Sequence, residues 1–359
     1  MEAKANAVDF QMRVKNNVQF RVDPLTGGQS RINPSRATRP TSTGGIDSNL
    51  QEIVEKAKSR DPFLPEVIFE KVPRFPESLG PDDGRIIRGE TVIFPNLHPF
   101  AENHAVAVMS NAHYLPLLGF TQTQLKDTLL ASQQFMNAVS STLTSETGRW
   151  YPTLVWNYMP PSAGSIIHPH MQIFVEERPT AEVERVLDLS SKYAAEHKSS
   201  YYADLAATEE KLDQRFVAKN EQLTVLTPFA PRGFNEVAIY FPGVCSITDL
   251  SEKQVEEAAA AMTKVLAGYE ALGVGSFNMA SFSGPIGDKR EDFWLHFKFF
   301  SRPYPSSIYT NDTGPTERMY DVWVINTIPE VYAQDLKKVW QQTPSAASGD
   351  DSSNSKEKP

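Results

Sequence analysis

The feature that most constrains the fold is an internal duplication. Pro99-Phe100-Ala101 recurs 129 positions later as Pro228-Phe229-Ala230, and His168 lies 128 positions before His296. A nearly constant offset over about 70 residues is typical of a repeated structural unit. Each copy reads strand, strand, helix, strand, loop and polar strand. The sequence therefore predicts an α+β fold of two tandem repeats, with a mainly antiparallel sheet and helices packed on it.

The periodicity of apolar residues places the elements of these repeats. Strands are expected at 18–22, 91–94, 105–108, 150–157, 237–241, 277–282, 293–300 and 321–326. Helices are expected at 120–143, 251–269 and 329–340, where apolar residues keep the 3.6-residue period. Asp249 or Ser251 is the expected N-cap of the second of these helices, and 180–226 reads as mostly helical.

Composition shifts divide the chain into four parts. The expected domains are an N-terminal arm at 1–48, a first, catalytic repeat at 49–180, a second repeat at 181–342 and a disordered tail at 343–359. The tail is polar and has no aromatic residue, so it lacks the apolar surface that folding requires. The arm holds Arg36 and Arg39 on a proline-broken segment, 31–40, where guanidinium groups suit phosphate contact. A solvated basic loop is the alternative.

Charge and cysteine content exclude several classes of protein. The net charge of −9 argues against general binding of nucleic acid, because no basic excess neutralises phosphates. The single cysteine, Cys245, excludes an internal disulfide and a multi-cysteine metal site. No apolar run is long enough to span a bilayer and no signal-like region opens the chain, so a cytoplasmic location is expected.

The segment His168-Pro169-His170-Met171-Gln172 is the strongest candidate for chemistry. Alternate side chains of a strand face one way, so His168, His170 and Gln172 are expected on one face. The residues expected to face the core are Ile167, Met171 and Ile173. A neutral imidazole is a competent nucleophile towards phosphorus. Two metal ligands, or two members of a buried hydrogen-bond network, are the alternatives for the histidine pair.

The motifs together resemble the galactose-1-phosphate uridylyltransferase family, within the histidine-triad superfamily. The matching segments are Asp23-Pro24-Leu25-Thr26-Gly27, Pro34-Ser35-Arg36-Ala37-Thr38-Arg39-Pro40, Phe94-Pro95-Asn96, the segment from His168 to Gln172, and Trp294-Leu295-His296. The resemblance spans about residues 20 to 340 and is more specific for the family than for a substrate.

The resemblance implies a ping-pong nucleotidyl transfer. His170 would attack the α-phosphorus of a nucleotide or nucleotide-sugar donor and form a covalent nucleotidyl-histidine, which a phosphate or sugar-1-phosphate acceptor would then resolve. Gln172 would hydrogen-bond the α-phosphoryl oxygens, and His168 would hold the loop, while a backbone carbonyl fixes the tautomer of His170. The substrate-binding residues implied are Arg36, Arg39, Asn96, Asn157, Ser165 and Lys298. Relatives of this kind are usually dimers, so a homodimer is expected.

The chain also departs from the family in its metal ligands. The zinc site of the family uses two cysteines and two histidines; His113 and His168 match the histidines, but no cysteine lies near Asp61. Two ligands bind zinc poorly, so no structural zinc and no cofactor is expected. His98 and His104 read as surface or supporting groups. The segment 313–323 does not match the hexose-contacting segment of the family, so galactose 1-phosphate is not supported as acceptor.

Three functions remain open from the sequence. The first is a nucleotidyltransferase or nucleoside-diphosphate-sugar phosphorylase that works through His170. The second is a histidine-triad-type hydrolase, in which water intercepts the same intermediate. The third is a non-catalytic nucleotide-binding protein that keeps the pocket. The nucleophile and the phosphate contacts are present together, which favours the first.

Overall fold

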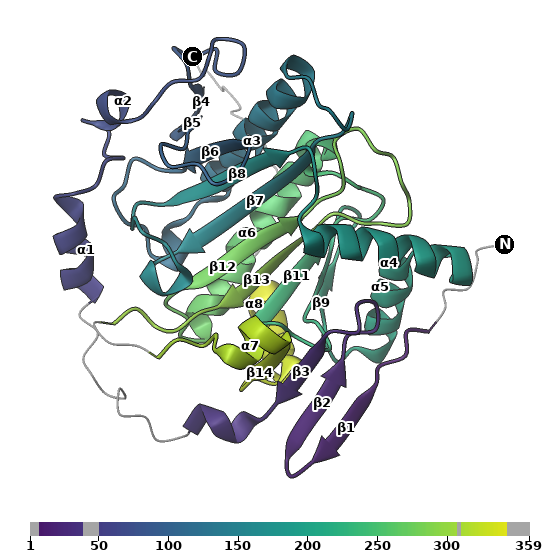
Figure 1. Ribbon diagram of the computed structural model, residues 1–359. Coiled ribbons are helices and arrows are strands. Elements are labelled where there is room, and N and C mark those ends of the chain that lie inside the picture. The colour runs from purple at the N-terminus through teal and green to yellow at the C-terminus, as the bar shows by residue number, and fades with distance from the viewer. Residues whose placement is uncertain (1–6, 39–49, 307–309, 343–359) are drawn as a thin grey trace, which may run out of the picture.

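One antiparallel sheet of ten strands runs through the molecule (Figure 1). The computed structural model describes residues 7–38, 50–306 and 310–342. The strands of the sheet are β4 (Ile86–Arg88), β5 (Thr91–Pro95), β6 (Asn103–Val108), β7 (Tyr151–Tyr158), β8 (His170–Glu176), β9 (Phe216–Lys219), β10 (Thr224–Leu226), β11 (Phe234–Tyr240), β12 (Phe277–Phe282) and β13 (His296–Ser301). Their order across the sheet is β4-β5-β6-β8-β7-β12-β13-β11-β10-β9.

The strand order contains the duplication. The first five strands lie in the order β4-β5-β6-β8-β7, and the second five repeat it as β9-β10-β11-β13-β12. The two halves meet where β7 pairs with β12, with Asn157 opposite Asn278. The predicted α+β class with two tandem repeats is therefore confirmed. The halves of the sheet occupy residues 86–176 and 216–301; the exact domain boundaries at 48, 180 and 342 stay predictions.

The register of the strands corrects the sequence alignment of the two copies. Val108 of β6 lies opposite His170, and Tyr240 of β11 lies opposite His296 in the same positions of the second half. The counterpart of His296 is therefore His170, and not His168. The offset is 126 positions for these histidines and 132 positions for Val108 and Tyr240. The offset of 128 between His168 and His296 lies between these two values, so the sequence comparison did not reveal the insertions and deletions in the loops.

Equivalent helices cover one face of both halves. α3 (Gln122–Thr142) follows β6, and α6 (Glu252–Ala271) follows β11. Both begin with a capping box, Thr121 with Gln124 and Ser251 with Gln254. Ser251 is thus the N-cap, one of the two predicted. α3 packs on α6, and α6 packs on the C-terminal helix α8 (Pro329–Gln342), so the largest apolar core lies between these helices and the sheet.

The opposite face of the sheet is covered differently in its two halves. Over the second half lie α4 (Ala181–His197) and α5 (Tyr201–Leu212), which bury an apolar cluster against the strands (Figure 1). Over the first half lie the short helix α2 (Ile68–Lys71) and the segment before it, with a smaller cluster. The helix α1 (Leu50–Lys58) precedes this segment. The thinner cover leaves room for a cavity in the first half.

The N-terminal arm forms a second sheet with a strand from near the C-terminus. The elements are β1 (Met12–Lys15), β2 (Val18–Val22), β3 (Gln29–Ile32) and β14 (Val322–Ile325), in the order β1-β2-β3-β14, with α7 (Pro315–Tyr320) before β14. Short 3-10 helices lie at Pro34–Thr38, Leu117–Gly119, Pro160–Ser162 and Ile247–Asp249. In this part of the molecule Arg21 binds Glu330 of α8, which fixes the arm on the second repeat.

Most predicted elements match the structure within a few residues. The segment 180–226 is mostly helical, as predicted, since α4 and α5 occupy it up to Leu212 and the strands β9 and β10 follow. The predicted disordered tail at 343–359 lies outside the described residues. Within the described ranges, no helix combines the length and the apolar character needed to cross a bilayer.

The capping box of α6 predicts a measurable loss of stability. Because the Ser251 hydroxyl accepts a hydrogen bond from the Gln254 N–H, Ser251→Ala is expected to lower the free energy of unfolding by about 1 kcal/mol. Urea denaturation measures it. The control is Ser141→Ala near the end of α3, where the hydroxyl only bonds its own helix. A loss for Ser251→Ala no larger than for the control would contradict the capping role.

Candidate active site

β8 presents its polar side chains to a cavity on the thinly covered face of the first half-sheet. His170 and Gln172 line this cavity of about 400 Å³, while Met171 and Ile173 are fully buried in the helix-side core. The predicted alternation therefore holds from His170 onward. It fails for His168, because β8 begins at His170 and His168 lies in the preceding loop, where its side chain has other partners.

The backbone fixes the tautomer of His170. Its Nδ1 lies 2.7 Å from the carbonyl oxygen of His168, which only accepts, so Nδ1 carries the proton and donates it. Nε2 then keeps its lone pair, and no protein group in the described residues hydrogen-bonds to it. Burial lowers the pKa of His170, so the ring is neutral at physiological pH. The expected carbonyl contact is present.

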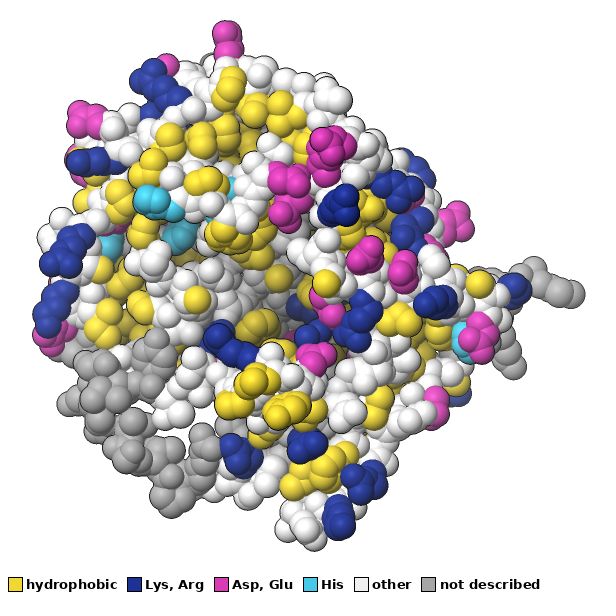
Figure 2. Space-filling view, in the orientation of Figure 1, with side chains coloured by type: hydrophobic (Ala, Val, Ile, Leu, Met, Phe, Trp, Pro, Cys, Tyr) yellow, Lys and Arg dark blue, Asp and Glu magenta, His cyan; other side chains and the backbone are white. Residues whose placement is uncertain are grey.

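The cavity has mostly apolar walls and a polar floor. Phe63 lies edge-on against both His168 and His170, with ring centroids 5.9 Å and 5.6 Å away. The other apolar lining residues are Pro62, Val72, Pro73, Phe94, Leu97, Val106 and Ile166. The polar lining residues besides His170 and Gln172 are Lys71, Asn96, His98 and Ser165. In Figure 2 histidine side chains lie among hydrophobic ones on the upper left of the face shown.

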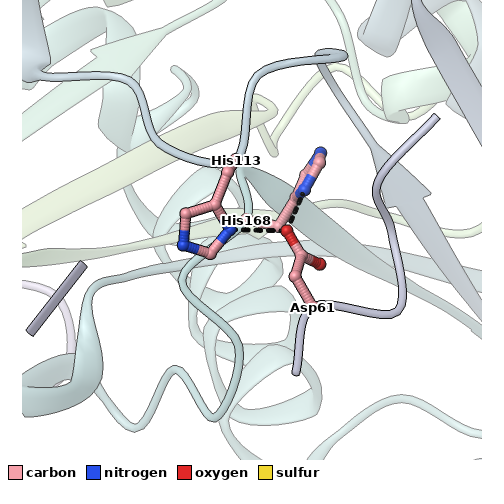
Figure 3. Close-up of side chains that lie close together, drawn as sticks. All are labelled: Asp61, His113 and His168. Carbon is pink, nitrogen blue, oxygen red and sulfur yellow. Dashed lines mark hydrogen bonds and ion pairs between the residues drawn. The ribbon is translucent and has the colours of Figure 1, made fainter. Parts of the chain in front are cut away.

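Three buried side chains hold the loop that precedes His170, and Figure 3 shows these three: Asp61, His113 and His168. One oxygen of Asp61, Oδ2, lies 2.5 Å from His113 Nδ1 and 2.7 Å from His168 Nδ1. The Nε2 atoms of the two rings face backbone oxygens, those of Val54 and Ser110. Burial alone would raise the pKa of Asp61, but the hydrogen bonds from His168, His113 and the Phe63 N–H lower it. His168 therefore anchors the residue whose carbonyl fixes His170.

Of the two readings given for His104, a surface or a supporting group, the structure supports the second. His104 is buried on β6, and its Nε2 lies 2.9 Å from Gln172 Oε1. His98 was treated in the same way, yet it lines the cavity. A histidine near the predicted strand of His170 was the available signal, but the pairing of β6 with β8 could not be read from the sequence. Phe63 and Lys71 were missed because they belong to a segment, ending in α2, whose packing over the sheet is also a long-range contact.

The cavity collects only some of the predicted substrate-binding residues. Asn96 and Ser165 line it. Asn157 does not; it lies at the junction of the two halves, where its Oδ1 accepts from Asn278 Nδ2 at 2.6 Å. Arg36 is exposed on the 3-10 helix Pro34–Thr38 and does not line the cavity either. Arg39 lies outside the described residues.

Lys298, a predicted substrate-binding residue, lies on β13 in the second half of the sheet and does not line this cavity. It is the counterpart of Gln172, two residues after His296, and it lines a cavity of only about 50 Å³. There its Nζ lies 4.8 Å from the centre of the Phe282 ring. Tyr201 and Tyr202 of α5 also line that cavity, and the Tyr202 ring lies 5.5 Å from that of His296.

His296 repeats the geometry of His170 without its cavity. Its Nδ1 lies 2.9 Å from the carbonyl oxygen of Trp294, as His170 lies beside that of His168. Its ring, however, stacks on Phe282 at 4.8 Å. Burial and the nearby Lys298 lower the pKa of His296 to about 3. The second half thus holds a matched imidazole beside a much smaller cavity.

Comparisons with known proteins place this fold. No protein-family model matches the sequence. An uncharacterized protein of Archaeoglobus fulgidus is 29% identical over 333 residues, which are 91% of this chain and 94% of the archaeal protein. The galactose-1-phosphate uridylyltransferase of Saccharomyces cerevisiae is 28% identical over 142 residues, which are 38% of this chain and 39% of the yeast protein.

The similarity of structure extends over most of the chain. An ADP-glucose phosphorylase from Arabidopsis thaliana, solved with bound ADP-glucose, matches with a TM-score of 0.68 at 16% identity, over 89% of this chain and 99% of that chain. Two solved uridylyltransferase structures match with a TM-score of 0.64 at 20% identity, over 90% of this chain and 98% of each of those chains. The chain therefore has the galactose-1-phosphate uridylyltransferase-like fold, as its motifs predicted.

The cluster of Asp61, His113 and His168 is the place where the family resemblance implies zinc. Their three donor atoms lie within 4.8 Å of one another. A structural zinc usually has four ligands about 3.3 Å apart, as bonds of about 2 Å to a tetrahedral ion require. Here there are three, and the separations of 2.5 Å and 2.7 Å are those of hydrogen bonds. The described donor set does not fit a structural zinc site.

Metal analysis tests the prediction of no structural zinc. Because Asp61 hydrogen-bonds both histidines directly, the purified protein is expected to contain only traces of metal and to keep its melting temperature in EDTA. Elemental analysis and a thermal melt measure these two quantities. Stoichiometric zinc that survives dialysis, together with a lower melting temperature in EDTA, would contradict it.

The burial of His296 predicts a dependence of stability on pH. The unfolded chain protonates this ring below about pH 6.5, whereas the folded chain does so only near pH 3. Between these values the unfolded state binds more protons, so the free energy of unfolding decreases as the pH falls. His296→Phe is expected to flatten this slope, and His197→Phe, at an exposed position, is the control. Urea denaturation from pH 4 to 7 measures it; equal slopes in all three proteins would refute the assignment.

Proposed function

We propose that this chain is a nucleotidyltransferase that acts on a nucleoside diphosphate-sugar or a related nucleotide through a covalent nucleotidyl-histidine at His170. A phosphate or a sugar-1-phosphate is the acceptor. The observation that carries the proposal is the hydrogen bond from His170 Nδ1 to the carbonyl of His168, which leaves Nε2 as the free nucleophilic atom at the cavity. The fold supports the class, since solved proteins with it include an ADP-glucose phosphorylase and uridylyltransferases.

The first step transfers the nucleotidyl group to the enzyme. The lone pair of His170 Nε2 attacks the α-phosphorus, and the bond from that phosphorus to the bridging oxygen breaks. The electron pair leaves with the phosphate or sugar phosphate, which needs little protonation at neutral pH. The Nδ1 proton stays on the ring and is held by the carbonyl of His168, which stabilises the positive charge of the phosphorylated imidazole.

The second step reverses the geometry of the first. An oxygen of the acceptor phosphate attacks the same phosphorus, the N–P bond breaks, and its electron pair returns to Nε2. In both steps charge develops on the non-bridging α-phosphoryl oxygens. Gln172, on the same face of β8 as His170, is positioned to donate to one of them, and Lys71 at the rim supplies a positive charge. Ser165 and Asn96 offer further polar contacts in the cavity.

Apolar walls suit the base of the nucleotide. Phe63, Val72 and Phe94 lie on the side of the cavity away from the helix-side core and offer flat surfaces to a ring. The cluster of Asp61, His113 and His168 takes no direct part in either step; it holds the loop whose carbonyl binds His170. Because Arg36 is exposed and does not line the cavity of its own chain, we also propose a homodimer in which this arm meets the substrate of the partner subunit.

A covalent adduct tests the proposal most simply. The protein is incubated with uridine, adenosine, guanosine and cytidine diphosphate-glucose in turn, and intact-protein mass spectrometry is read before and after acid treatment. One nucleotidyl group per chain is expected with at least one donor, and it is acid-labile. His170→Ala is expected to abolish it. His296→Phe, which changes the matched imidazole of the second half, is expected to keep it.

The reaction products distinguish a transferase or phosphorylase from a hydrolase. With phosphate present, the nucleoside diphosphate is expected, and without an acceptor the adduct persists. Rapid release of nucleoside monophosphate without acceptor would instead indicate a hydrolase. A wild-type protein that binds these donors but gives no adduct would show a non-catalytic binding protein and would overturn the proposal.

A further inference from the structure

His104 lies beside the proposed catalytic strand, outside the group of residues that touch the substrate. It is on β6 opposite Phe174, two pairs along from Val106, which lies opposite Gln172, and its side chain is buried. Its ring packs edge-to-face against Phe100 and Phe174, with centroids 4.5 Å and 4.6 Å away, and these two rings contact each other at 5.0 Å. Packing in this three-ring cluster restricts the orientation of the His104 ring.

The backbone determines which nitrogen of His104 carries the proton. The N–H of Phe100 points at His104 Nδ1 at 3.3 Å, and an N–H only donates, so Nδ1 is the acceptor. Burial lowers the pKa of His104, so the ring is neutral and has one proton, which must be on Nε2. His104 Nε2–H therefore needs an acceptor.

That acceptor is Gln172. Its Oε1 lies 2.9 Å from His104 Nε2. Asn96 Nδ2 also lies 3.0 Å from this nitrogen, but the N–H of His98 donates to Asn96 Oδ1 and so turns the amide nitrogen of Asn96, a donor, towards the ring. Of the two neighbouring amides, only that of Gln172 presents an oxygen.

We infer that His104 is a positioning residue for the transfer. By binding Oε1, it fixes the amide of Gln172 so that the NH₂ group is the part turned to the cavity, where the α-phosphoryl oxygens need donors. A flipped amide would present oxygen to a phosphate and repel it. The chain of contacts runs from the Phe100 N–H through His104 to Gln172. This inference rests on the proposed function of His170.

A double-mutant cycle in single turnover tests the inference. His104→Phe keeps an aromatic ring packed against Phe100 and Phe174 but removes the donor. It is expected to slow formation of the His170 adduct by about 10- to 100-fold, the effect of one misplaced donor. The dissociation constant of the nucleotide is expected to change much less. His104→Gln, whose amide also donates, is expected to recover part of the rate.

The cycle distinguishes positioning from packing. In a Gln172→Ala background, His104→Phe is expected to have no further effect on the rate, because the amide that it orients is gone. An unchanged rate for His104→Phe in the otherwise wild-type chain, or an equal loss in both backgrounds, would overturn the inference while the wild-type adduct still supports the proposed function. If wild type forms no adduct, both fail. His104→Leu replaces His104→Phe in the cycle if the latter does not fold.

Discussion

The site depends on one hydrogen bond, from Nδ1 of His170 to the backbone oxygen two residues before it. A free imidazole exchanges its proton between two nitrogens and is an equally good donor or acceptor on either side. The His168 carbonyl accepts a hydrogen bond from Nδ1, so the proton stays on Nδ1 and the unprotonated Nε2 is left for the cavity. The carbonyl itself is held because the side chain of the same residue, His168, is bound between Asp61 and the backbone of Ser110. Buried polar contacts of the loop thus fix the position of the carbonyl that orients His170.

Duplication explains why only one half of the sheet is a candidate for chemistry. Both halves place a histidine at the same register, each with Nδ1 beside its own backbone carbonyl. The two halves differ in the elements that cover this face of the sheet. In the second half α4 and α5 bury the strand face, and the residual cavity is about 50 Å³ against about 400 Å³ in the first half. The geometry of the strand that carries the histidine is therefore not enough to make a ligand cavity. The size of the cavity depends on α4 and α5, which lie between the two halves of the sheet in the sequence.

The features that the sequence predicted correctly are those that depend on residues close together in the chain. The periods of apolar residues fixed α3, α6 and most strands, and the His168–Gln172 motif located the cavity floor. What needed long-range pairing was missed. The contact of His104 with Gln172 requires β6 to lie beside β8, and the contact of Asp61 with His168 joins residues 107 positions apart. The equivalence of Lys298 with Gln172 was not predicted either, because a constant offset conceals loop insertions, which only the strand register reveals.

The most direct measurement of the central claim is the nitrogen to which phosphorus becomes bonded. Protein labelled with ¹⁵N in histidine is trapped with a nucleotide donor, and the one-bond ¹⁵N–³¹P coupling is observed by NMR. The account predicts coupling to Nε2 of a single histidine, lost in His170→Ala, with Nδ1 still protonated. Coupling to Nδ1, or phosphorus bonded to any other residue during turnover, would contradict it.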